Sequence, residues 1–146
     1  MLHWLMVFGY VFFVFFFAKQ QASSARYTNA LLARWLPNLA PAQIGRLVFL
    51  TRKAVHVFAY GGLTLIVHYA ARRTKITRAQ ALPFAVMFAL VVAVLDESYQ
   101  MRLPHRTGTS ADVYIDGIGI AAAAWGIWLG GRLRKKDREV KEDVEE

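Results

Sequence analysis

Four blocks of apolar residues, each 17 to 19 residues long, constrain the fold of this chain more than any other feature. They cover residues 2–18, 54–71, 79–95 and 113–131, and only the last contains a charged residue, Asp116. An apolar helix of roughly 20 residues spans the hydrocarbon core of a bilayer, where a helix satisfies its own backbone hydrogen bonds. The sequence therefore predicts an all-α, polytopic transmembrane bundle of about four spans.

The composition agrees with a membrane protein and argues against a nucleic-acid-binding one. Of the 146 residues, 56% are hydrophobic, whereas a soluble domain has roughly 45–50%. Lys and Arg outnumber Asp and Glu by 18 to 10. The basic residues, such as Arg52 and Arg72, cluster beside the apolar blocks, as lipid headgroups and membrane topology favour. No nucleic acid is expected as a partner, and the absence of cysteine excludes disulfides and thiolate metal sites.

Positive charges in the connections orient such a bundle in the membrane. With the N-terminus inside, ten Lys and Arg residues would lie on the cytoplasmic side and eight outside. This difference slightly favours an N-in, C-in arrangement in the bacterial cytoplasmic membrane. The block 2–18 lacks the early Lys or Arg of a signal peptide, so a retained anchor is expected, with cleavage within residues 22–25 as the alternative.

The first connection, residues 19–53, is the longest. Its apolar residues at helical spacing are Leu31, Leu32, Trp35 and Leu36. They predict a short amphipathic helix that lies in the membrane interface and is broken by Pro37. Residues 42–50 would form either a second interfacial turn or an extension of the second span.

The fourth block, residues 113–131, is rich in Gly and Ala, and small residues let helix backbones approach closely in lipid. This span is therefore expected at the centre of the bundle. Residues 1–131 would make up the membrane domain. Residues 132–146, first basic and then acidic, would form a charged tail that is helical or disordered.

Polar residues gather at the start of the second block, the end of the third and around the start of the fourth. They are Lys53, His56, Tyr60, Asp96, Glu97, Gln100, Arg106, Ser110, Asp112 and Asp116. In an antiparallel bundle these three chain segments share one membrane face. Spacings of three and four residues place Lys53, His56 and Tyr60 on one helix face. Asp112 and Asp116 also share a face, and because like charges repel, the pair is expected to face Lys53, Arg106 or a metal.

Taken in order, these residues resemble the pattern of VanZ-like membrane proteins. The pattern reads Lys53-x2-His56-x3-Tyr60, then Asp96-Glu97-x2-Gln100, then Arg106-x3-Ser110-x-Asp112-x3-Asp116-x2-Gly119. The resemblance covers about residues 50–130. Two features depart from it: Asp116 stands where the family usually has Asn, and residues 101–105 stand in place of Phe-x-Pro-Gly. The resemblance implies a bacterial multi-pass protein of the cell envelope, in a family named after a protein linked to teicoplanin resistance, and it supplies no molecular activity.

The first functional hypothesis is a membrane-embedded binding module. Its ligand would be an envelope lipid headgroup, a cell-wall precursor such as a polyprenyl phosphate, or a glycopeptide. The ligand-binding residues would be Lys53, Tyr60, Gln100, Arg106, Ser110, Asp112 and Asp116. A carboxylate-rich face suits cationic or hydroxylated ligands, whereas Lys53 and Arg106 suit a phosphate.

The second hypothesis is an enzyme acting on a phosphate-bearing lipid. His56 would be the general acid or base, or the nucleophile, with Asp96 or Glu97 orienting it. In a variant of this hypothesis, Mg²⁺ would bind between Asp96, Glu97, Asp112 and Asp116, because hard cations prefer carboxylate oxygens. The third is a structural subunit, in which the charges form a salt-bridge network that holds helices together. The sequence leaves the ligand, the turnover and the oligomeric state open.

Overall fold

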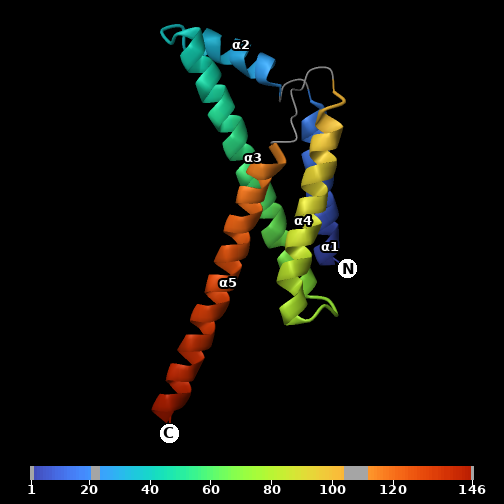
Figure 1. The fold of residues 1–146 in the computed structure, drawn as a ribbon, viewed down its shortest axis with the longest axis vertical. Helices are drawn as coiled ribbons and strands as arrows, with labels where there is room; N and C mark the ends of the chain where they lie inside the picture. Colours follow the sequence, from blue (N-terminus) through green and yellow to red (C-terminus); the bar gives the residue numbers. More distant parts are fainter. Residues whose placement is uncertain (1, 21–23, 104–111, 146) are drawn as a thin grey trace.

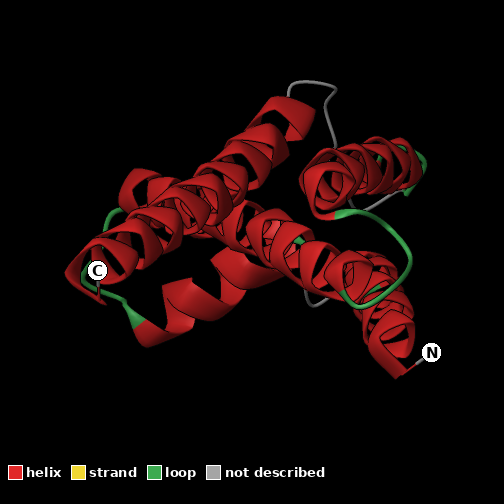
Figure 2. Ribbon diagram, turned by 90° about the horizontal axis from the view of Figure 1, so that it is seen from below, coloured by secondary structure: helices red, strands yellow, loops and turns green. Residues whose placement is uncertain are grey.

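Five α-helices make up the described part of the chain in the computed structural model, which covers residues 2–20, 24–103 and 112–145. They are α1 (Leu2–Lys19), α2 (Ala25–Trp35), α3 (Pro41–Arg72), α4 (Arg78–Gln100) and α5 (Asp112–Glu145). Figure 1 shows their arrangement, and Figure 2 shows that only helices and loops occur in these residues. The predicted all-α fold is confirmed.

Local sequence signals start three of these helices. Ser24 caps α2 and Thr77 caps α4, each by accepting a hydrogen bond from the backbone N–H three residues further on. Pro41 opens α3, at a position where its missing N–H is tolerated. The Gln43 side chain accepts a hydrogen bond from the Ala40 N–H at 2.9 Å, which satisfies a donor just before the first turn.

Four of the helices are long and apolar enough to cross a membrane: α1, α3, α4 from Ala79 onward and α5 as far as Lys136. The predicted number of spans is therefore confirmed, and α2 is the short helix predicted in the first connection. With its 32 residues, α3 is about 48 Å long, which exceeds a hydrocarbon core of about 30 Å. Residues 42–50 thus extend the second span as one continuous helix.

The central helix of the bundle is α3. It contacts α1, α2, α4 and α5, whereas α5 contacts only α3 and α4 within the described residues. The expectation that the fourth span lies at the centre is wrong, because α5 leaves the bundle after its first turns (Figure 1). A Cβ atom added to Gly126, Gly130 or Gly131 would meet no atom within 4 Å, so no neighbouring helix requires glycine at these three positions.

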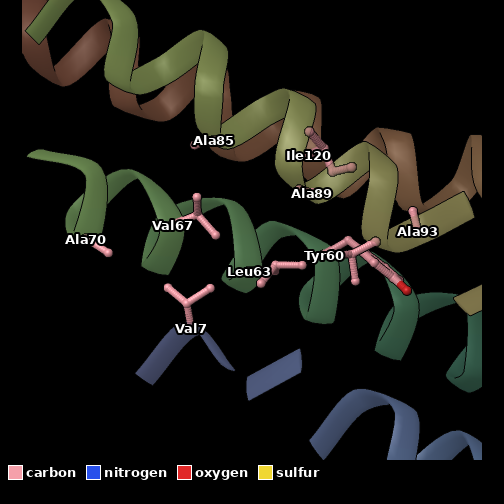
Figure 3. Close-up of a cluster of buried hydrophobic side chains, with 10 residues drawn as sticks. Val7, Tyr60, Leu63, Val67, Ala70, Ala85, Ala89, Ala93 and Ile120 are labelled. Carbon is pink, nitrogen blue, oxygen red and sulfur yellow. The ribbon is translucent and has the colours of Figure 1, made fainter. Parts of the chain in front are cut away.

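Small residues pack the core between α3 and α4. Ala85, Ala89 and Ala93 of α4 are fully buried in one cluster with Val67 of α3 (Figure 3). Their four-residue spacing lines one face of α4, and small side chains allow the close helix packing that stabilises bundles in lipid. Tyr60 lies at one end of this cluster in Figure 3, with its hydroxyl directed away from the apolar side chains.

A very close approach between helices occurs where α3 crosses α5. A Cβ atom added to Gly119 would lie 2.1 Å from the backbone oxygen of Val57. One added to Gly61 would lie 3.1 Å from the backbone oxygen of Gly119. Only a residue without a side chain therefore fits at Gly119, and this crossing sets the separation of two helices that carry predicted site residues.

Candidate functional site

The structure brings together the polar side chains of three helices. Lys53, His56 and Tyr60 lie in the middle of α3, Asp96, Glu97 and Gln100 in the last turns of α4, and Asp112 and Asp116 in the first turns of α5. The end of α4 and the start of α5 lie at the level of this part of α3 (Figure 1). The other two predicted residues, Arg106 and Ser110, lie outside the described residues.

Lys53 and Asp112 form an ion pair that joins α3 to the first residue of α5. Both side chains are partly exposed, at 24% and 18%. Asp112 lies at the N-terminal end of α5, where the helix dipole also favours a negative charge. Lys53, one of the cations expected to face the two aspartates of α5, therefore contacts Asp112, whereas Arg106 lies outside the described residues.

His56 contacts the deeper aspartate of α5. Its Nδ1 lies 2.8 Å from Oδ1 of Asp116, whose side chain is 1% exposed. When Asp116 is ionised it can only accept, so Nδ1 is then the donor in this contact, and in a neutral imidazole Nε2 is the nitrogen left to act as an acceptor. The sequence suggests Asp96 or Glu97 as the residue that orients His56. In the structure this residue is Asp116.

Asp96 is engaged by two other side chains. Its Oδ2 accepts hydrogen bonds from the Tyr60 hydroxyl at 2.9 Å and from Gln100 Nε2 at 2.8 Å, and all three side chains are buried. Oδ1 of Asp96 and Oδ2 of Asp116 have no hydrogen-bond partner among the described residues. Since buried polar atoms are normally paired, these two oxygens keep an unused capacity to accept a hydrogen bond.

Arg52 is a site residue that the sequence pattern does not single out. From the sequence, it is one of the basic residues that flank a span. In the structure it interacts electrostatically with Glu97, whose side chain is 2% exposed. Its four-residue spacing from His56, which puts both on one face of α3, is the signal that could have identified it.

The four carboxylates proposed as Mg²⁺ ligands do not form a common cage. Asp96, Asp112 and Asp116 each have a different side-chain partner, on α3 or within α4. Within the part of the chain that the structure describes, no group of three or more His, Cys, Asp or Glu residues is arranged to hold a metal ion. The carboxylates of these residues instead serve as partners for donor side chains.

Two cavities lie beside these residues and share part of their lining. The smaller, of about 230 Å³, has a largely apolar wall that includes Val14 and Phe17 of α1. The larger, of about 430 Å³, has a more polar wall that includes Asn29, Lys53 and Asp112. The residues that line both are Val48, Arg52, His56 and Gln100. The site therefore offers an apolar and a polar compartment with a common wall.

Comparison with known proteins agrees with this architecture. A family model described as VanZ/LLP1 matches residues 3–131, which include α1 from its second residue onward, α2 to α4, α5 as far as residue 131 and every residue of the site. No curated protein and no solved structure matches the chain. The resemblance seen in the sequence is thereby confirmed. The chain is a multi-pass membrane protein that belongs to the VanZ/LLP1 family.

Proposed function

We propose that this protein binds an amphiphilic molecule of the cell envelope, such as a membrane lipid or a lipid-linked cell-wall precursor. The observation that carries the proposal is the pair of cavities, one with a largely apolar wall and the other with a more polar wall. An amphiphile would place its chain against Val14 and Phe17 and its head beside Arg52 and His56. Such a division suits an amphiphile because a polar head buried against an apolar wall would lose hydrogen bonds.

The protein would act in the bacterial cytoplasmic membrane, with both termini inside, as the distribution of basic residues favours. A glycopeptide is an alternative ligand of the same cavities. Teicoplanin added in the binding experiment below tests it, since a glycopeptide ligand would displace the bound lipid in proportion to its concentration.

Filling the apolar cavity from its rim is expected to remove the bound amphiphile. Thr51 is exposed and lines the smaller cavity, so a Trp at this position would occupy the cavity without displacing buried side chains. After incubation with a bacterial lipid extract, native mass spectrometry of the wild-type protein in detergent should show a discrete lipid adduct. The Thr51→Trp variant should show less than a tenth of that occupancy.

Leu50→Trp is the matched control for this experiment. Leu50 neighbours Thr51, is 63% exposed and lines neither cavity, so its replacement should leave the adduct unchanged. Size-exclusion chromatography would establish that both variants are folded. A folded Thr51→Trp protein with wild-type occupancy would contradict binding in this cavity.

The contact between His56 and Asp116 favours a second candidate, acid–base catalysis on the bound amphiphile. In this contact, His56 Nδ1 lies 2.8 Å from Asp116 Oδ1 and is occupied by it. His56 also lines both cavities. Nε2 would accept the proton of a water or hydroxyl group that attacks the phosphorus of a phosphate ester, and it would return this proton to the alcohol oxygen that leaves as the ester P–O bond breaks. Asp116 would hold the imidazole in the required tautomer and stabilise its protonated form.

Turnover separates this second candidate from binding alone. If His56 is a general base, wild-type protein incubated with phosphatidylglycerol in detergent should form a cleaved product that mass spectrometry detects. His56→Gln should then lower the rate at saturating lipid by about 10²- to 10⁴-fold. Absence of any product from the folded wild-type protein, with the lipid bound, would exclude this activity for that lipid and leave the binding function.

A further inference from the structure

Among the described residues, those with a charge that line the larger cavity have a net positive charge. They are Arg52, Lys53 and Asp112. Lys53 and Asp112 form an ion pair and so largely neutralise each other. Arg52 is therefore the cation of the described lining that lies outside this pair, at the wall that the two cavities share, and its charge partner Glu97 does not line the cavity.

The other carboxylates of the site do not line the larger cavity. Asp96 lines the smaller one, whereas Glu97 and Asp116 line neither. Glu97 interacts electrostatically with Arg52 from outside the cavity lining. A guanidinium carries five N–H donors in a planar fork, so an arginine can donate to a protein carboxylate and to a ligand at the same time. The buried carboxylate would orient the guanidinium toward that ligand.

Two amide side chains add donors to the same wall. Asn29 donates one hydrogen bond from Nδ2 to the Ala25 oxygen at 2.9 Å, and Gln100 donates one from Nε2 to Asp96 at 2.8 Å. Each amide nitrogen has two N–H groups, so each has a further donor beyond these contacts. Both side chains line the larger cavity together with Arg52.

We infer that the head of the bound amphiphile is a phosphate group, held in the larger cavity by Arg52 with support from Asn29 and Gln100. This inference rests on the proposed function and specifies its ligand class. A tetrahedral phosphate presents pairs of oxygens that match the guanidinium fork, and such charge-assisted bonds are the stronger ones. The hydrocarbon chain attached to the phosphate would pass the residues that line both cavities and occupy the smaller one.

Three lipids with the same two oleoyl chains test the head group. They are dioleoyl phosphatidylglycerol, uncharged dioleoylglycerol and a cationic dioleoyl trimethylammonium lipid without phosphate. Native mass spectrometry of the full-length protein should show the phosphatidylglycerol adduct at least tenfold more tightly held than the other two. Arg52→Gln should weaken phosphatidylglycerol binding by about 10- to 100-fold and leave dioleoylglycerol binding unchanged. Arg46→Gln is the matched control, because Arg46 is an exposed arginine of α3 that lines neither cavity, and it should bind as the wild type does.

The outcomes distinguish failure of the phosphate assignment from failure of the proposed amphiphile-binding function. Preference of the wild type for the cationic or the uncharged lipid, or unchanged binding by folded Arg52→Gln, would overturn the phosphate assignment and leave the proposed function standing. The preference of the wild-type protein among the three lipids is measured without any variant, so it tests the phosphate assignment even if Arg52→Gln fails to fold. If inorganic phosphate binds as tightly as phosphatidylglycerol, the hydrocarbon chains of the lipid contribute nothing to binding, and their placement in the smaller cavity would be wrong. Failure of all three lipids to bind the folded wild type would overturn the proposed function itself.

Discussion

Replacement of Gly119 by alanine is expected to lower the free energy of unfolding by about 3 kcal/mol, at the upper end of overpacking effects. The new Cβ would lie 2.1 Å from the Val57 oxygen, a backbone atom that cannot rotate away. Helices α3 and α5 would have to separate, which would also loosen the approach of Gly61 to the Gly119 oxygen. A Cβ added to Gly61 would lie only 3.1 Å from that oxygen. Thermal unfolding in detergent, monitored by circular dichroism, measures the decrease in stability.

Gly126→Ala provides the matched control on the same helix. A Cβ added at Gly126 meets nothing within 4 Å, and alanine has the higher helix propensity, by up to about 1 kcal/mol. This variant should be as stable as the wild type or slightly more stable. An unfolding temperature of Gly119→Ala equal to that of Gly126→Ala would show that the helices do not cross as closely as the structure has them.

Removal of His56 alone is expected to destabilise the protein more than removal of His56 together with Asp116. His56→Leu takes the hydrogen-bond partner from a carboxylate that is 1% exposed, which costs about 3–5 kcal/mol when the group stays charged. In the double variant, His56→Leu with Asp116→Leu, no unpaired charge remains, and part of the loss should be recovered. Asp116→Leu alone should have an intermediate effect, because the His56 side chain left behind is 20% exposed and can reach other hydrogen-bond partners.

The measurement is a double-mutant cycle of thermal unfolding, with a second pair as its control. Lys53 and Asp112 are more exposed, at 24% and 18%, so the same cycle on this pair should give a coupling of about 1 kcal/mol or less. Equal destabilisation by His56→Leu and by the double variant would mean that the two side chains are not coupled. If the folded double variant also keeps its lipid adduct, the pair stabilises the bundle and takes no part in binding.

The number of spans and the meeting of three polar segments could be predicted from the sequence. A chain in lipid must satisfy its own backbone hydrogen bonds, so long apolar blocks become helices whatever else they contact. Successive spans alternate in direction, which brings the polar end of α4 and the polar start of α5 to the level of Lys53 and His56. Helical periodicity also placed Lys53, His56 and Tyr60 on one face of α3, and each contacts an aspartate of another helix.

The choice of partners was decided only by the tertiary structure. Periodicity specifies on which face of its own helix a residue lies. It does not specify how one helix is rotated relative to another or how far apart the two helices are. These depend on packing contacts such as Gly119 against Val57, which brings α5 close enough for Asp116 to reach His56. The same packing makes α3 the central helix. No local pattern encodes the cavities or the place of Arg52 between them, because a cavity is the space left by side chains from several helices that are distant in sequence.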